Sequence, residues 1–214
     1  MRYAYSSSAF NRELSSGDLT QLEFIDAVAR ETLFDGIVLD DRHFPRTDGD
    51  YLAQIKKMAA DLGLTIAALA SDAFFVADEG AMQAALERAL AIGAPLLAGR
   101  LGAETALSWS EQLHRLGTAS SLAKSANITL AVRNAPGTFA ASEHDCKRVT
   151  KETDSAWLRY GLEPAAFGSA ADMTPLREKT VLLWIDEQKG SPLDPLWSGF
   201  HGFAVIEKQK LNRT

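Results

Sequence analysis

Short apolar runs alternate along this chain with longer segments whose apolar residues recur at helical spacing. The runs are rich in Val, Ile, Leu and Ala and are bounded by Gly, Pro, Asn or Asp, which is the pattern of buried strands. The segments that fit this description are Arg2–Tyr5, Gly36–Asp40, Leu64–Leu69, Ala94–Arg100, Ile128–Arg133, Trp157–Glu163, Val181–Asp186 and Phe203–Glu207.

Helices are predicted between most of these strands. Asp18 is a candidate N-cap for the first helix, and Gly63 and Gly93 directly follow two later helices, where glycine commonly ends a helix. The predicted helices are Leu19–Leu33, Asp50–Leu62, Glu79–Ile92, Ser108–Ala126, Ser142–Thr153 and a short one around Met173–Glu178.

Alternating strands and helices predict an α/β fold made of repeated βα units. Parallel strands that are apolar almost throughout, because both faces are buried, close best as a (β/α)8 TIM barrel. The alternative is a doubly wound open sheet, which usually has a glycine-rich phosphate loop after its first strand, and Ser6–Phe10 is not such a loop. Since no linker-like segment interrupts residues 1–214, we expect one domain.

The predicted barrel is compact, with shortened or missing last helices. The segment from Glu187 to Phe200 holds two prolines and at most a turn of helix, and little chain follows Glu207. The outer faces of the last and first strands would then be partly uncovered. We expect a symmetric partner in a homodimer, or a rearranged segment of the chain, to cover them.

Composition and charge narrow the classes of function. The formal net charge of −6 and the isoelectric point near 5.3 argue against a nucleic-acid-binding surface. Cys146 is the only cysteine, so no internal disulfide forms and a cytoplasmic location is expected. No apolar run approaches the length of roughly 20 residues that a membrane span needs, and the N-terminus lacks the apolar region of a signal peptide.

Charged and polar residues stand at the ends of several predicted strands, which in a barrel meet at one mouth, where active sites lie. Carboxylates there are candidate acid/base groups, whereas arginines bind phosphate or carboxylate groups or pair with the acids. The candidate catalytic residues are Glu163, Glu207 and Arg133, and the candidate substrate-binding residues are Arg100, Asn134, Asp40, His43 and Asp186. The alternative for the acids and arginines is structural ion pairing, and for Asp40 to His43 it is a loop held by internal hydrogen bonds.

Several segments resemble one known group of proteins, the xylose isomerase-like TIM-barrel superfamily. This superfamily includes sugar-phosphate isomerases and epimerases and the endonuclease IV-type repair enzymes. The segments that carry the resemblance are Leu22–Asp26, Phe34–Pro45, Tyr51–Leu52, Ala60–Ile66 and Ile128–Asn134.

The resemblance implies a divalent metal at the mouth, held by a Glu ending strand five, an Asp ending strand six, a His near the end of strand seven and a Glu ending strand eight. This chain has Arg133 in place of the first and Glu163 in place of the second, and it retains Glu207. Leu183–Asp186 offers no His, and Val38 stands where strand two usually has an acidic residue. A guanidinium cannot ligate a metal and repels it, so no metal and no other cofactor are predicted.

The resemblance also suggests what the mouth would bind. Our first hypothesis is a sugar isomerase- or epimerase-like barrel for a polyol, sugar acid or sugar phosphate. Its chemistry would be metal-independent proton transfer, with Glu163 or Glu207 as base and Arg133 or Arg100 holding the negative charge. The alternative is a non-catalytic barrel that senses a ligand or acts as a partner subunit. A repair nuclease fits least, since the chain is acidic and poor in His.

Overall fold

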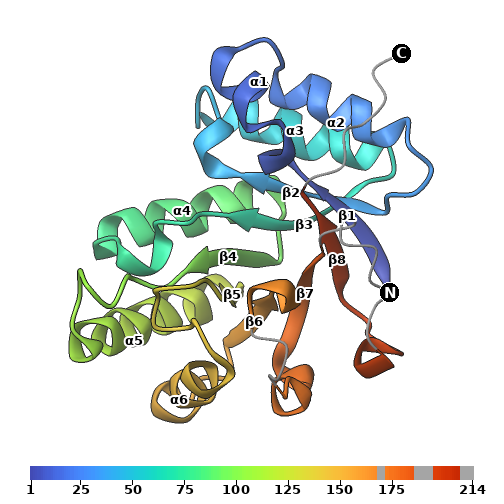
Figure 1. Ribbon diagram of the computed structural model, residues 1–214. Coiled ribbons are helices and arrows are strands. Elements are labelled where there is room, and N and C mark those ends of the chain that lie inside the picture. Colours follow the sequence, from blue (N-terminus) through green and yellow to red (C-terminus); the bar gives the residue numbers. More distant parts are fainter. Residues whose placement is uncertain (168–171, 186–194, 208–214) are drawn as a thin grey trace.

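The structure is a computed structural model that describes residues 1–167, 172–185 and 195–207 of the 214-residue chain. Eight parallel strands form a closed barrel in sequence order, and the last strand pairs with the first (Figure 1). The strands are β1 (Arg2–Ser6), β2 (Gly36–Asp40), β3 (Thr65–Ala70), β4 (Leu96–Arg100), β5 (Thr129–Arg133), β6 (Leu158–Leu162), β7 (Thr180–Ile185) and β8 (Phe203–Ile206). The predicted (β/α)8 barrel is therefore confirmed.

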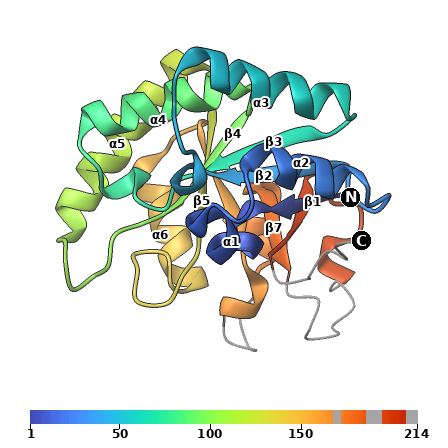
Figure 2. The same ribbon diagram turned by 90° about the horizontal axis from the view of Figure 1, so that it is seen from above.

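The α-helices follow the earlier strands and lie outside the barrel (Figure 2). They are α1 (Asn11–Ser16), α2 (Gln21–Ala29), α3 (Gly49–Asp61), α4 (Glu79–Ile92), α5 (Trp109–Ala126) and α6 (Glu143–Thr153). Where the structure describes the chain beyond β6, its helical segments are 3-10 turns, namely η4 (Pro164–Ala166), η5 (Thr174–Lys179) and η7 (Pro195–Trp197). This agrees with the expected shortening of the last helices. None of the described helices combines the length and apolar character that a membrane span requires.

The first helices differ from the prediction. The N-cap of α2 is Thr20 and not Asp18: the Thr20 hydroxyl accepts a hydrogen bond from the Glu23 amide, and the Glu23 carboxylate accepts one from the Thr20 amide. This capping box satisfies two backbone N–H groups at the helix start. Asp18 instead accepts a hydrogen bond from Ser16. The short helix α1 was not predicted, because Leu14 is its one buried residue and no apolar periodicity marks it.

The buried apolar residues form two clusters, one between the strands and the helices and one inside the barrel. Residues that alternate along the strands pack either against the helices or into the barrel interior. The interior combines small and large side chains, which are Ala4, Val38, Ala67, Ala68, Ala98, Ala131, Leu182, Trp184, Phe203 and Val205. Gly161 faces the Trp184 ring so closely that a Cβ there would lie 2.3 Å from a ring carbon. The interior is a packed core that supports the mouth.

The outer faces of β8 and β1 are largely covered. Tyr5, Ala204 and Ile206 are almost fully buried, and the Tyr5 ring packs edge-on against Phe34 at 5.0 Å between centroids. On the same face of β1, Tyr3 is partly buried, so the expected exposure is limited to the start of this strand. This burial weakens the argument for a homodimer that rested on an uncovered face, and the homodimer stays an untested prediction.

Candidate functional site

The mouth of the barrel is lined by polar residues at the ends of the strands. Ala131 and Val205 point into the barrel, so the period-two alternation along β5 and β8 turns Arg133 and Glu207 inward as well. The same argument places Glu163, directly after β6, in this layer, above Gly161. Residues from three strands thus meet at one point, although they lie far apart in the sequence.

Arg133 lies between two carboxylates. Its Nη1 donates to Glu207 Oε1 at 2.8 Å and its Nη2 to Glu207 Oε2 at 2.9 Å, which is a bidentate pair. Nη2 also donates to Glu163 Oε2 at 2.8 Å. The Arg133 side chain is only 11% exposed, against 29% for Glu163 and 21% for Glu207. We call Arg133, Glu163 and Glu207 the arginine–glutamate cluster.

Further groups hold this cluster from below and from the side. Trp184 Nε1 donates to Glu207 Oε1 at 2.9 Å, and the Arg133 guanidinium carbon lies 4.6 Å from the centre of the Trp184 ring. The Ser6 hydroxyl makes a longer bond of 3.5 Å to the same oxygen. Burial alone would lower the pKa of Arg133, but the hydrogen bonds and charges of Glu207 and Glu163 raise it above its ordinary value. The guanidinium therefore stays charged.

Asn134 holds the backbone beneath Glu163. Its side-chain oxygen accepts from the Glu163 amide at 2.7 Å, and its side-chain nitrogen donates to the Glu163 carbonyl at 3.1 Å. Asn134 is almost fully buried. The sequence suggested a substrate contact here, and the structure places the Asn134 amide in a clamp that positions Glu163.

Asp40 and His43 belong to a second hydrogen-bonded group at the mouth, on the side of β1 and β2. Asp40 accepts from Arg42 and from the Ser8 hydroxyl, the latter at 3.1 Å. Burial raises the pKa of Asp40, yet the hydrogen bonds and charge of Arg42 outweigh this and hold that pKa below its ordinary value. Asp40 is thus an ionised partner of Arg42.

His43 is buried between two polar side chains. Its Nδ1 lies 3.3 Å from the Ser7 hydroxyl and its Nε2 lies 2.9 Å from Asn11 Oδ1. Because the Asn11 oxygen can only accept, Nε2 carries the proton and Nδ1 is the acceptor for Ser7. Burial lowers the pKa of His43. These contacts are the internal hydrogen bonds that the sequence left open as the alternative for this loop.

Arg100 ends β4, and its Cα pairs in register with that of Arg133. Arg100 Nη1 lies 3.6 Å from Asp72 Oδ2, and its side chain is 40% exposed. Asp186 lies outside the described residues. The role of Trp184 as a hydrogen-bond donor was not predicted, although period-two alternation along β7 turns this residue toward the mouth.

Among the described residues, the side chains that meet at the mouth do not match the ligand set of a divalent metal. Within the described ranges, no group of three or more His, Cys, Asp or Glu side chains is arranged as metal ligands. Glu163 and Glu207 are the two carboxylates that face each other, and the Arg133 guanidinium bonds to both. A cation that cannot ligate a metal therefore lies between the two carboxylates.

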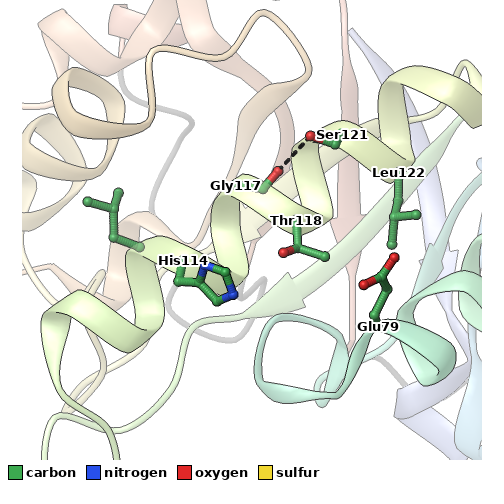
Figure 3. Close-up of a pocket in the computed structure, with 7 residues that line it drawn as sticks. Glu79, His114, Gly117, Thr118, Ser121 and Leu122 are labelled. Carbon is green, nitrogen blue, oxygen red and sulfur yellow. Dashed lines mark hydrogen bonds between the residues drawn. The ribbon is translucent and has the colours of Figure 1, made fainter.

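Other features of the described chain lie apart from the mouth. A groove runs between the start of α4 and the middle of α5, lined by Glu79, His114 and Thr118 among others (Figure 3). This groove is on the helical layer, and Glu79 and His114 are the titratable residues among the described ones that line it. Burial raises the pKa of the Cys146 thiol to about 12, so the thiol is protonated and unreactive at neutral pH.

Residues 27–185 match the model of a family described as xylose isomerase-like TIM barrel. No curated protein matches the sequence. Among solved structures, the probable 3-DHS dehydratase AsbF of Bacillus anthracis has a TM-score of 0.75 and 15% identity, with 97% of this chain and 92% of that chain covered. An L-ribulose 3-epimerase has a TM-score of 0.71 and 17% identity, with 98% and 82% covered. An AP endonuclease of family 2 from Brucella melitensis has a TM-score of 0.73 and 16% identity, with 100% and 95% covered.

Proposed function

Because this chain belongs to the xylose isomerase-like TIM-barrel family, we propose that it binds a small polyhydroxylated ligand of the sugar type at the mouth of its barrel, without a divalent metal. The observation that carries this proposal is the position of Arg133, which bonds Glu207 twice and Glu163 once. The sugar class is supported by neighbours such as the L-ribulose 3-epimerase, whose fold this chain shares.

Arg133 would replace a metal in balancing charge, though not in chemistry. Two carboxylates that face each other at a partly buried mouth repel unless a cation lies between them. The guanidinium supplies that cation and five N–H donors, but it has no vacant coordination site for a ligand oxygen. A ligand would therefore be held by hydrogen bonds from side chains and not by coordination.

Glu163 is the group best placed to move a proton. It is the more exposed of the two carboxylates. Within the described residues, its carboxylate accepts one hydrogen bond, from Arg133 to Oε2. Asn134 fixes its backbone. In this proposal Glu163 takes a proton from a carbon next to a ligand carbonyl, and the guanidinium of Arg133 stabilises the resulting enediolate.

A second candidate function is ligand binding without catalysis. The observation that favours it is the saturation of Glu207, which accepts hydrogen bonds from Arg133, Trp184 and Ser6. An epimerase or isomerase commonly needs two acid/base groups, and a carboxylate bound in this way is poorly available as the second one.

A metal-controlled screen tests the proposal. The melting temperature is measured with aldoses, ketoses, sugar acids and sugar phosphates, in the presence of EDTA and again with added Mn²⁺. Stabilisation by at least one sugar in EDTA is expected. Stabilisation by sugars only with Mn²⁺, or calorimetric binding of Mn²⁺ to the unaltered protein, would overturn the metal-free part of the proposal.

Isotope exchange separates the two candidate functions. Each sugar that binds is incubated with the protein in D₂O, and loss of the carbon-bound proton next to its carbonyl is followed by NMR. Proton transfer by Glu163 predicts exchange that Glu163→Gln abolishes and that Glu87→Gln, an exposed carboxylate change on α4, leaves intact. Binding without exchange would support the non-catalytic function.

A further inference from the structure

Within the part of the chain that the structure describes, Arg100 differs from the other arginines around the mouth in having no side-chain hydrogen bond. Arg133 donates three hydrogen bonds to carboxylates, and Arg42 donates three to Asp40. Arg88 donates to Asp41 at 3.2 Å. For Arg100, the distance of 3.6 Å from Nη1 to Asp72 Oδ2 is too long for a hydrogen bond.

The Arg100 guanidinium is also incompletely satisfied. Its Nε is buried and has no hydrogen-bond partner, while 40% of the side chain is open to solvent. A buried N–H donor without an acceptor is unfavourable, and a guanidinium forms its strongest bonds through paired N–H groups on one edge. A small shift of this side chain toward an incoming acceptor would give Nε–H and a neighbouring Nη–H a shared partner.

The position of Arg100 fits a contact with a ligand in the mouth. Its Cα pairs with that of Arg133 across β4 and β5, so the two arginines stand side by side at the strand ends. The Arg133 side chain is 11% exposed, and its guanidinium forms ion pairs with Glu163 and Glu207. The Nε of Arg133 is also buried without a partner, but of these two in-register arginines Arg100 is the one that is exposed and has no hydrogen bond to a carboxylate of the described residues.

We infer that Arg100 anchors an oxyanion, a carboxylate or a phosphate, carried by the ligand, so that the protein prefers acidic or phosphorylated sugars to neutral ones. This inference rests on the proposed function, since it names the chemical class of ligand for the same mouth. Planar paired donors match both kinds of oxyanion, which is why arginine recognises them. The sequence left Arg133 and Arg100 as equal candidates for this role, and the geometry assigns it to Arg100.

Asp72 competes with such a ligand. Its carboxylate is 38% exposed and, among the described residues, forms the ion pair with the Arg100 guanidinium. A bound oxyanion has to replace this loose ion pair and is repelled by the charge of Asp72. Removing that charge without changing the size of the side chain, as in Asp72→Asn, therefore favours binding of the anion. The variants Arg100→Gln and Asp72→Asn should act in opposite directions.

The experiment compares matched neutral and anionic probes by calorimetry. The pairs are D-fructose with D-fructose 6-phosphate and D-glucose with D-gluconate, and inorganic phosphate is added as a separate probe. At least one anionic member should bind about tenfold more tightly than its neutral partner. Arg100→Gln should bring the two members within about threefold of each other, whereas Asp72→Asn should widen the difference.

Three controls make the result decisive. Arg30→Gln changes the charge equally at an exposed site on the helical side and should leave the preference unchanged. Arg100→Lys keeps the charge without the paired donors and should retain part of the preference, which covers the case in which Arg100→Gln fails to fold. High salt should weaken the anionic probes and spare the neutral ones.

The results that would overturn this inference differ from those that would overturn the proposed function. Equal affinity for both members of each pair, or a preference that survives in Arg100→Gln, overturns the role of Arg100 while sugar binding stands. Binding of inorganic phosphate through Arg100 with no binding of any sugar overturns the proposed function alone. Failure of every anionic probe to bind the unaltered protein overturns the inference.

Discussion

Replacing Arg133 by Met removes the cation from the arginine–glutamate cluster and keeps an unbranched side chain of similar length. Three charge-assisted hydrogen bonds are lost, two to Glu207 and one to Glu163. The two carboxylates remain close together without a partner guanidinium. We expect Arg133→Met to destabilise the fold strongly.

The size of the effect follows from burial. Removing one member of a buried ion pair costs about 3–5 kcal/mol, because the partner charge is left uncompensated. Glu163 and Glu207 keep 29% and 21% of their side chains exposed, so water compensates in part and the lower end applies. For a chain of this size, a loss of about 3 kcal/mol lowers the melting temperature by roughly 6–12 °C.

The loss of folding stability in Arg133→Met should also depend on pH, and its direction can be worked out. In Arg133→Met the folded state gains by taking up a proton between the two facing carboxylates, whereas in the unfolded chain they are separate. The folded variant then binds more protons than the unfolded one, so its stability rises as the pH falls toward about 5. The gap between the variant and the unaltered protein should therefore narrow on acidification.

Urea unfolding followed by circular dichroism, at pH 7.5 and at pH 5, measures both effects. The matched control is Arg30→Met, directly after α2, where the side chain is 70% exposed and the expected change is within about 0.5 kcal/mol. The double variant Arg133→Met with Glu207→Gln should recover part of the loss, since one unpaired charge is removed. A loss in Arg133→Met no larger than in the control, or equal at both pH values, would refute this account of the cluster.

Three further changes test the surroundings of the site. Asn134→Ala removes both bonds to the Glu163 backbone and should cost about 1–3 kcal/mol in urea unfolding, because the Glu163 amide loses its partner, whereas the Glu163 carbonyl keeps its bond from the Ala166 amide. His43→Gln should flatten the pH dependence of stability: burial lowers the pKa of His43, so the unfolded chain binds the extra proton and the unaltered protein loses stability as the pH falls below about 6.5. Gly161→Ala forces the Trp184 ring to move and should cost about 1–3 kcal/mol, with a changed near-ultraviolet dichroism of Trp184; an unchanged signal would contradict the close packing.

Much of the fold could be read from the sequence because it depends on apolar patterning. The runs at Gly36–Asp40 and Ile128–Arg133 are apolar almost throughout, as strands buried on both faces must be. The positions of the strand ends then place Arg133, Glu163 and Glu207 in one layer, since successive residues alternate between the two sides of the barrel wall.

The remaining features depend on contacts that local patterns do not record. The start of α2 was misplaced because Asp18 and Thr20 are both good capping residues, and the choice is made by Glu23, which completes the capping box of Thr20. Gly161 and Trp184 are complementary in size between the neighbouring strands β6 and β7, which no local pattern in either strand reveals. The orientation of Asn134 was missed for the same reason, since its two bonds reach a residue on the neighbouring strand.

At the position where the resemblance implies an acid, the barrel can accommodate Arg133 because of where this residue lies. Arg133 is the last residue of β5, so its side chain projects into the mouth above the packed interior, and the ladder below it is unchanged. What the fold requires there is a positive charge between Glu163 and Glu207, and a guanidinium meets that requirement as a metal ion would. The two differ in what they offer a ligand, because a metal accepts lone pairs while a guanidinium only donates protons. In our proposal this backbone therefore supports a different set of reactions from a metal site, because likeness of fold does not fix the chemistry of a site.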